Sequence, residues 1–157
     1  MIEISKINSA EPYKEFQKYY DYALSNKQSS IEAIVISSYN KTSNEVESRF
    51  VNLKYILNDE WIFFSNYNSN KSENFASHNQ ISALFYWNAI DVQIRIKAKI
   101  KRSSSELSDK HFDNRSREKN ALAISSNQSK TIETYENVLS EYNKVIENKN
   151  KPLKRPD

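Results

Sequence analysis

Glycine is absent from all 157 residues of this chain, and that absence constrains the fold more than any other feature of the sequence. Glycine takes a positive φ more readily than any other residue, so tight turns must here rely on Asn, Asp and Ser. The absence also excludes the glycine-rich loops that bind phosphate in P-loop and dinucleotide-binding proteins. A phosphate bound by this chain must therefore be held by side chains and helix N-termini.

Strict alternation of residue types predicts a strand with one exposed face over residues 93–100. Ile94 and Ile96 begin its apolar side, while Gln93 and Arg95 begin a polar side that continues with lysines. Such a basic face is typical of a solvated or ligand-facing sheet surface. A nucleic-acid or acidic-protein surface is the less favoured alternative, and salt-sensitive retention on DNA or RNA would be its test.

The other segments predict an α+β fold. We expect helices at 12–24, 69–78, 103–112 and 132–145, and strands at 31–37, 46–54, 61–65, 81–87 and 94–100, with ALAI at 121–124 a short apolar patch. The order lacks βαβ alternation, so we predict a mostly antiparallel closed or split β-barrel with peripheral helices. One domain should span residues 1–157, with mobile tails at 1–11 and 148–157.

The composition disfavours several functional classes. Cysteine is absent, so we expect no disulfides and no thiolate chemistry, which is compatible with a cytoplasmic location. We expect no membrane contact, because no apolar run reaches the roughly 20 residues that span a bilayer. His78 and His111 lack metal-site spacing, so no metal is expected. The net charge of +3 comes from charges that alternate in sign, which argues against a nucleic-acid partner.

The stretch 49–71 is the candidate binding region. It predicts a hairpin followed by the start of a helix, with Arg49 and Lys54 on the first strand and Ser65 and Lys71 further along. One interpretation is a half-buried hairpin with solvated basic residues. The other is an anion site, because hydroxyls and a lysine come together where a helix begins.

Six strings occur in a fixed order along the chain: RFVNLK, FFSN, NSNK, FYW, VQIRIKAKIKR and SSNQS. Together they resemble the pyridoxamine 5′-phosphate oxidase family of FMN-binding split-barrel flavoproteins, over roughly residues 12–156. The resemblance implies a homodimer with FMN in a cleft between the subunits. It also implies hydride transfer from the 4′ carbon of pyridoxamine or pyridoxine 5′-phosphate to FMN, with reoxidation by O₂ to hydrogen peroxide.

The resemblance assigns roles to individual positions. RFVNLK at 49–54 matches the family's R-x-x-x-L-K strand, and FS at 64–65 matches its Tyr/Phe-Thr/Ser pair. NK at 70–71 matches the end of the family's S-R-K motif, and QS at 128–129 matches its Q-S pair. The implied FMN-binding residues are Arg49, Phe50, Val51, Leu53, Lys54, Phe64, Ser65, Asn70, Lys71, Gln93, Gln128 and Ser129. The implied substrate-binding residues are Lys54, His111, Arg115 and Lys119. No residue is assigned a catalytic role of its own.

The chain departs from the family pattern at several positions. Asn70 stands in place of the arginine of S-R-K, which removes one phosphate-binding charge. His111 replaces a tyrosine and Lys119 a serine. The family's Trp-Gly-Gly segment and R-L-H-D-R motif, which complete both sites, do not occur before Asp157. The alternative function is therefore a non-catalytic flavin- or pyridoxal-phosphate-binding protein that lacks the C-terminal part of the active site.

Overall fold

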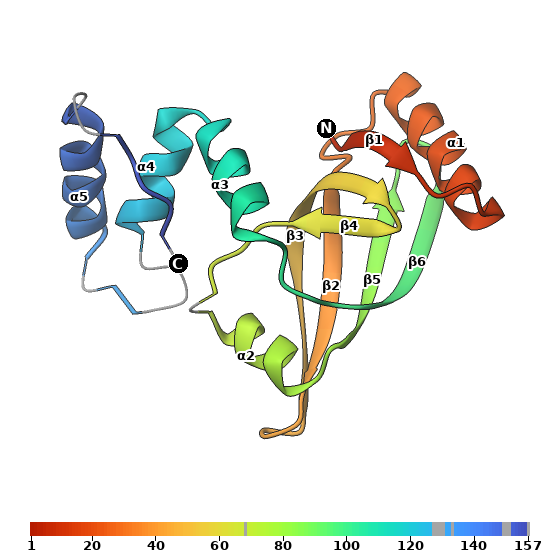
Figure 1. The fold of residues 1–157 in the computed structure, drawn as a ribbon, viewed down its shortest axis with the longest axis horizontal. Helices are drawn as coiled ribbons and strands as arrows, with labels where there is room; N and C mark the ends of the chain where they lie inside the picture. Colours follow the sequence, from red (N-terminus) through yellow and green to blue (C-terminus); the bar gives the residue numbers. More distant parts are fainter. Residues whose placement is uncertain (68, 127–130, 133, 149–151, 157) are drawn as a thin grey trace. The chain divides into compact units, whose positions relative to one another are not determined.

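The computed structural model describes residues 1–67, 69–126, 131–132, 134–148 and 152–156 (Figure 1). Contacts between Cα atoms divide the chain into two compact units. The barrel unit comprises Met1–Ser65 and Glu73–Lys101, and the helical unit comprises Asn66–Ser72 and Arg102–Asp157. Each unit is described by itself, and the expectation of a single domain stays a prediction.

The barrel unit contains six strands joined in one sheet. They are β1 (Glu3–Ile7), β2 (Ala33–Asn40), β3 (Glu45–Asn58), β4 (Glu60–Phe63), β5 (Gln80–Trp87) and β6 (Val92–Lys99). Their order is β1-β3-β2-β5-β6, with β4 also paired to β3. Every pairing is antiparallel except that of β1 with β3, which confirms the mostly antiparallel α+β barrel predicted from the sequence.

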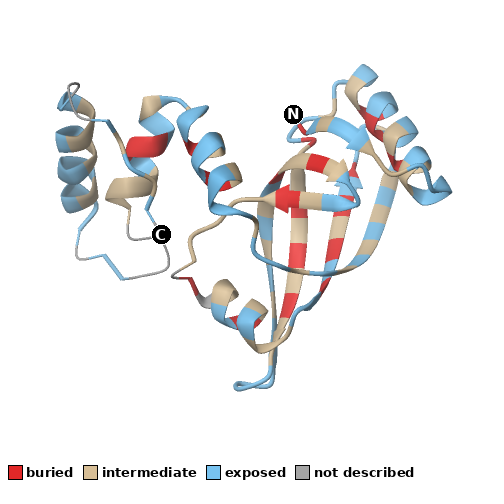
Figure 2. Ribbon diagram, viewed as in Figure 1, coloured by how far each residue is buried: buried red, intermediate tan, exposed pale blue. Residues whose placement is uncertain are grey.

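The long strand β3 belongs to both halves of the barrel. Its first part, from Glu45 to Asn52, pairs with β2, and its second part, from Leu53 to Asn58, pairs with β4 and β1 (Figure 1). Side chains alternate along these strands, so one face is apolar and buried while the other is exposed (Figure 2). The predicted alternation of β6 is confirmed, because Ile94, Ile96 and Ala98 are half-buried and the residues between them are exposed.

Helix α1 (Glu11–Ser25) packs an aromatic stripe against the barrel core. Pro12 lies in its first turn, as predicted, where a missing backbone N–H costs no hydrogen bond. The ring of Phe16 lies 4.4 Å from that of Trp61 and 5.6 Å from that of Trp87, measured between centroids. Full burial of such side chains contributes about 1.5–3 kcal/mol each, so this cluster anchors α1 to the barrel.

Turns in this glycine-free chain use the residues that the sequence analysis predicted, with one exception. Ser30, Asn44, Asn58 and Asp91 all have a positive φ, between 48° and 60°. Short polar side chains tolerate this conformation because they can hydrogen-bond locally. The exception is Lys27, at φ 56°, just after the C-terminus of α1.

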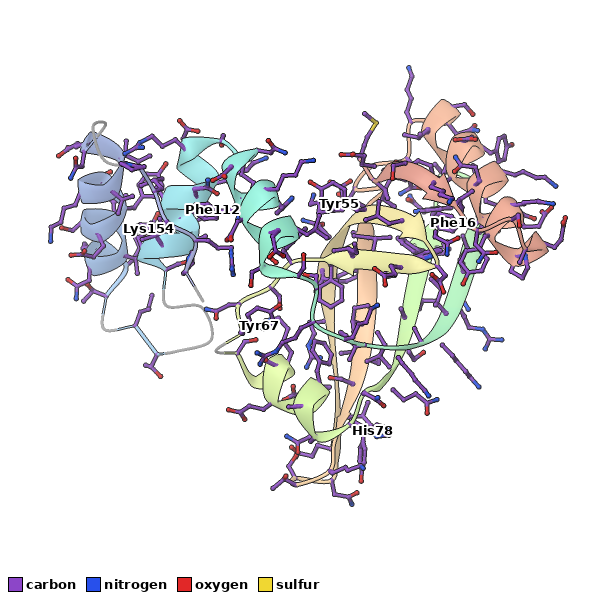
Figure 3. The ribbon with its side chains drawn as sticks, viewed as in Figure 1. Phe16, Tyr55, Tyr67, His78, Phe112 and Lys154 are labelled. Atoms are coloured by element: carbon purple, nitrogen blue, oxygen red, sulfur yellow. The ribbon has the colours of Figure 1, made fainter. Side chains whose placement is uncertain are left out.

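The helical unit contains α3 (Ser105–Asp113), α4 (Arg117–Ser125) and α5 (Tyr135–Glu147), while α2 (Asn70–Ser77) begins in this unit and ends in the barrel unit. Side-chain oxygens of Ser104, Ser116 and Thr134 accept hydrogen bonds at the starts of α3, α4 and α5. Phe112 on α3, labelled in Figure 3, is the large apolar side chain that this unit buries. None of the residues of α5 is buried, although its predicted apolar stripe is present.

Two elements were missed by the sequence analysis. Residues 3–7, assigned to an N-terminal tail, form β1, whose start is held because Ile2 N–H donates to the Tyr20 hydroxyl over 2.9 Å. Alternating polar residues at a sheet edge leave little apolar signal for such a strand. Helix α4 was not predicted, and its residues 121–124 were described only as a short apolar patch, because its apolar residues are consecutive and form no helical stripe. Ser116 before an acidic first turn was the signal that could have revealed it.

Candidate functional site

A β-bulge at Lys54 is the structural centre of the candidate site. In the pairing of β3 with β4, Leu53 lies opposite Phe63 and Tyr55 opposite Ile62, so Lys54 is an extra residue without a partner in that ladder. Before the bulge Val51 and Leu53 face the core, whereas beyond it the buried residue is Ile56. A bulge bends a strand and re-aims its side chains, so Lys54 points in a direction that a regular strand would not give it, whereas Arg49 lies in the regular ladder with β2.

Arg49 lies on the inward face of β3 and is held by a polar cluster. Its Nη1 donates to Ser38 Oγ over 2.7 Å, and its Nη2 donates to Glu47 Oε2 over 2.5 Å. Asn74 on α2 donates to the same Glu47 oxygen over 2.9 Å, and Asn40 donates to Asn74 over 2.8 Å. Ser38 and Asn74 are each 2% exposed, so the guanidinium stands at the edge of the protein interior.

Lys54 is paired with a second carboxylate. Its Nζ lies 3.5 Å from Glu32 Oε1, while the N-terminal amine of Met1 lies 3.5 Å from Glu32 Oε2. Burial alone would raise the pKa of Glu32, but a backbone hydrogen bond and the charges of the amine and Lys54 outweigh burial and lower that pKa. Glu32 is therefore a stable anion at neutral pH.

The other predicted flavin residues of the barrel unit lie near its surface. Phe50 is 74% exposed on the outer face of the sheet, in register with Val35 of β2. Phe64 follows β4 and meets the ring of Tyr55 edge-on at 6.0 Å between centroids. Ser65 is half-buried, and Gln93 is exposed opposite Tyr86 on the outer face. Flat apolar rings and one amide on these surfaces suit a planar heterocycle.

In the helical unit, the predicted phosphate-binding residues surround the start of α2. Lys71 Nζ donates to Ser69 Oγ over 2.8 Å, and Ser69, 2% exposed, donates to the Asn66 carbonyl over 2.7 Å. The guanidinium of Arg102 stacks 4.6 Å above the ring of Tyr67, which is labelled in Figure 3. Asn70 is the first residue of α2, and its side chain is outside the description, as are Gln128 and Ser129.

The predicted substrate residues of the helical unit occupy α3, α4 and the turn between them. His111 lies half-buried near the end of α3, and Lys119 is exposed in the first turn of α4. Arg115, in the turn, donates from Nη2 to the Lys119 carbonyl over 3.0 Å. Burial lowers the pKa of Arg115, yet a guanidinium stays protonated at neutral pH. Arg115 and Lys119 therefore bring two positive charges to one corner.

The predicted flavin residues thus belong to both units. Arg49, Lys54, Phe64, Ser65 and Gln93 are in the barrel unit, whereas Lys71 is in the helical unit. Within the barrel unit the structure adds partners that the sequence analysis missed: Glu47, Ser38, Asn74 and Glu32. Glu47 could have been found, because it precedes Arg49 by two residues and so shares its face of the strand. The others approach from different elements and left no local signal.

A surface pocket of about 220 Å³ lies in the barrel unit next to this polar cluster. Its lining includes Ser38 of the cluster together with Tyr39, His78 and Lys97. The His78 ring, labelled in Figure 3, meets the ring of Tyr39 edge-on at 5.7 Å. Ser38 belongs both to the pocket lining and to the Arg49 cluster, whereas Arg49, Glu47 and Asn74 do not line the pocket.

The described residues lack both a metal-binding cluster and a membrane-spanning helix. No group of three or more His, Cys, Asp or Glu side chains among them comes together as a metal ion requires. None of the helices in that part of the chain is long and apolar enough to cross a membrane.

Comparison with known proteins identifies the family. The sequence model of the family described as pyridoxamine 5′-phosphate oxidase matches residues 29–145. The chain belongs to the pyridoxamine 5′-phosphate oxidase family. It is 31% identical over 148 residues to a pyridoxine/pyridoxamine 5′-phosphate oxidase of Legionella pneumophila, covering 94% of this chain and 68% of that relative. It is 28% identical to the enzyme of the same name from Leptospira interrogans, covering 83% of this chain and 60% of the relative.

Solved structures confirm the predicted fold class of this family member. PhzG from Burkholderia lata, solved in complex with tetrahydrophenazine-1-carboxylic acid, superposes with a TM-score of 0.86 at 20% identity, over 93% of this chain and 71% of that one. A pyridoxamine 5′-phosphate oxidase-related, FMN-binding protein from Nostoc punctiforme superposes with a TM-score of 0.64 at 11% identity, over 83% of this chain and 72% of that one. The split-barrel architecture is therefore shared with both.

Proposed function

We propose that this chain is a cytoplasmic FMN-dependent oxidoreductase of vitamin B6 metabolism. Its reaction would be oxidation of the 4′ carbon of pyridoxamine or pyridoxine 5′-phosphate, with hydride passing to FMN and O₂ taking up the electrons as hydrogen peroxide. The membership of the family over residues 29–145 supports the reaction class. The chain spans about two thirds of the length of the curated relatives, so the complete activity is part of this proposal.

The observation that carries the proposal is the placement of two cations on β3, one before its bulge and one at the bulge. Arg49 precedes the bulge and Lys54 forms it, at the positions where the family's R-x-x-x-L-K strand has its basic residues. A phosphate monoester requires cationic donors and hydroxyls, and a flavin ring requires flat apolar contacts with a few amides. The described residues supply each of these groups, so their chemistry fits FMN.

Each of these residues would have a separate task. Arg49 would bind the phosphate of FMN through its guanidinium. Lys71, in the helical unit, would have the FMN-binding role that the family's S-R-K motif implies. Phe64 would provide an apolar surface to the ring, and the Gln93 amide would hydrogen-bond its polar edge. Lys54, with its flexible stem, would orient both the ring and the substrate.

The corner formed by α3 and α4 would bind the phosphate of the substrate. Arg115 still has donors beyond the one it gives to the Lys119 carbonyl, because a guanidinium carries five. The Lys119 ammonium is exposed and adds a second charge. The His111 side chain, half-buried on α3, would hydrogen-bond the substrate where the family uses a tyrosine hydroxyl.

A second copy of the chain is the proposed partner. The outer face of the barrel sheet exposes large apolar side chains, including Val46 at 70%, Phe50 at 74% and Tyr86 at 61%. Such exposed patches are typical of protein interfaces. Light scattering on the eluting protein should therefore give the mass of a dimer, twice 18.4 kDa. A Phe50→Glu variant should shift it toward the monomer, and Tyr22→Glu on the outside of α1 should not.

The test of the function is a visible absorption spectrum of the purified chain, recorded after FMN addition and desalting. A retained flavin band, followed by peroxide release on adding pyridoxamine 5′-phosphate, is the expected result. A retained band without turnover would favour the non-catalytic flavin-binding alternative. One observation favours that second candidate: carboxylates already pair with both Arg49 and Lys54. A protein that holds no flavin would contradict both.

A further inference from the structure

The pairing of Arg49 with Glu47 has a consequence beyond the proposed function. Glu47 lies directly opposite Ser38 in the β2–β3 ladder, and Arg49 follows two residues later on the same inward face. The three side chains meet through the Arg49 guanidinium, at 2.7 Å to Ser38 and 2.5 Å to Glu47. The donors that a phosphate would use are thus already directed at an internal carboxylate.

The cluster holds Glu47 in place by more than this ion pair. Asn74, buried on α2, donates to the same carboxylate oxygen over 2.9 Å and also lies 3.4 Å from Ser38 Oγ. Asn40 fixes the orientation of Asn74 by donating to its carbonyl oxygen over 2.8 Å. Because Asn74 is 2% exposed, its amide cannot turn toward water, and Glu47 is positioned whether or not Arg49 is engaged elsewhere.

The charges of the cluster decide what it can bind. The positive charge of Arg49 and the negative charge of Glu47 cancel one another. Their side chains are 21% and 42% exposed, so an incoming anion can reach the pair. A dianionic phosphate bound to Arg49 would lie within a few ångströms of the Glu47 carboxylate, whether it displaces that carboxylate or shares the five-donor guanidinium with it. Two like charges at about 4–5 Å repel strongly where water is partly excluded. A ligand such as riboflavin, which has no phosphate at this end, is not repelled by the Glu47 carboxylate.

We propose that Glu47 is a specificity-determining residue that competes with the FMN phosphate for Arg49 and thereby weakens the preference of the site for FMN over uncharged riboflavin. The inference rests on the proposed flavin-binding function and deepens it. It concerns only residues of the barrel unit. The alternative is that Glu47 merely joins β2, β3 and α2, in which case its charge affects stability and not ligand choice.

Glu47→Gln is the informative variant, because glutamine keeps an oxygen for Arg49 and Asn74 and removes only the charge. Glu45→Gln is the matched control, since Glu45 is exposed two residues earlier on β3 and the net charge changes equally. FMN and riboflavin are titrated against each protein by flavin fluorescence. We expect Glu47→Gln to bind FMN about tenfold more tightly than the wild type, which corresponds to about 1.4 kcal/mol. Riboflavin affinity, and both affinities of Glu45→Gln, should change less than about twofold.

Equal or weaker FMN binding by Glu47→Gln, or an equal gain for riboflavin, would overturn the inference and leave the proposed function standing. If neither the wild type nor either variant binds FMN, the proposed function fails. The inference about Glu47 is then tested by titrating the proteins with inorganic phosphate. The Arg49 side-chain NMR signal should respond to phosphate at lower concentration in Glu47→Gln than in the wild type. An unchanged response overturns the inference. Glu47→Ala repeats the comparison if Glu47→Gln does not fold.

Discussion

The barrel unit and the helical unit hold their functional residues by different means. In the barrel unit, Arg49 lies beside a core that includes Ile36, 3% exposed, and Phe85, 0% exposed. It donates to Ser38 and Glu47, and Asn74 of α2 contacts both of these partners. In the helical unit, Arg115 is held by one backbone carbonyl of the next helix, and α5 buries no residue. Arg49 in the barrel unit is therefore held by more groups than Arg115 in the helical unit, and the following experiments examine that difference.

The largest expected effect is on the barrel core. Phe85 is fully buried, and its ring lies 5.3 Å from that of Trp87, so Phe85→Ala should lower the free energy of unfolding by about 3–5 kcal/mol. Leu139→Ala on α5, where the leucine is 44% exposed, should cost about 1 kcal/mol or less. Urea denaturation followed by circular dichroism measures both. Equal losses would show that the helical unit is as tightly packed as the barrel.

The second effect concerns ligand binding in the barrel unit. Arg49→Ala removes the cation proposed to bind the FMN phosphate and leaves Glu47 behind, so FMN affinity should fall by about 10- to 100-fold. The control is Lys41→Ala, which removes an exposed charge from the β2–β3 turn. Flavin fluorescence titration measures both variants. If Arg49→Ala binds FMN as tightly as the wild type, Arg49 does not belong to the FMN site.

The third prediction concerns how far the stability of helix α4 depends on its N-cap residue. The Ser116 hydroxyl accepts from the Lys119 N–H at the start of α4, and Ser116→Ala should destabilise that helix by about 1 kcal/mol. Amide hydrogen exchange should speed up in α4 and not in β2 or β5 of the barrel. Ser140→Ala, exposed in the middle of α5, removes a hydroxyl without removing a cap. Unchanged exchange in α4 would mean that packing, and not the cap, sets its stability.

The smallest effect is the pH dependence of the Glu32 pair. The folded pKa of Glu32 lies below its unfolded value of about 4.3, so the folded state favours the carboxylate. That contribution is fully present above the unfolded pKa and is lost as the pH falls through the folded one. The wild type should exceed Glu32→Gln in stability by less than about 1 kcal/mol at pH 7, and the difference should shrink as the pH falls below the unfolded pKa. A difference that grows on acidification would contradict this assignment.

Local sequence patterns were sufficient for much of the barrel. Alternation along β6, the aromatic stripe of α1 and the polar residues at positive φ follow from chemistry within a few residues, and all appear as predicted. The positions of Arg49 and Lys54 on one strand could also be predicted. The weakly patterned elements could not, because β1 is defined by its parallel partner β3 and α4 by its cap and its neighbours.

The sequence alone determined the fold class and the family, and it predicted the residues that could bind a flavin phosphate, because these depend on residue type and spacing along the chain. Only the tertiary structure decided what those residues contact. Glu32 approaches Lys54 across 22 positions, and Asn74 approaches Glu47 across 27. Charge neutralisation acts through space, so the partners that come from distant segments depend on how β2, β3 and α2 pack, and no local pattern records them.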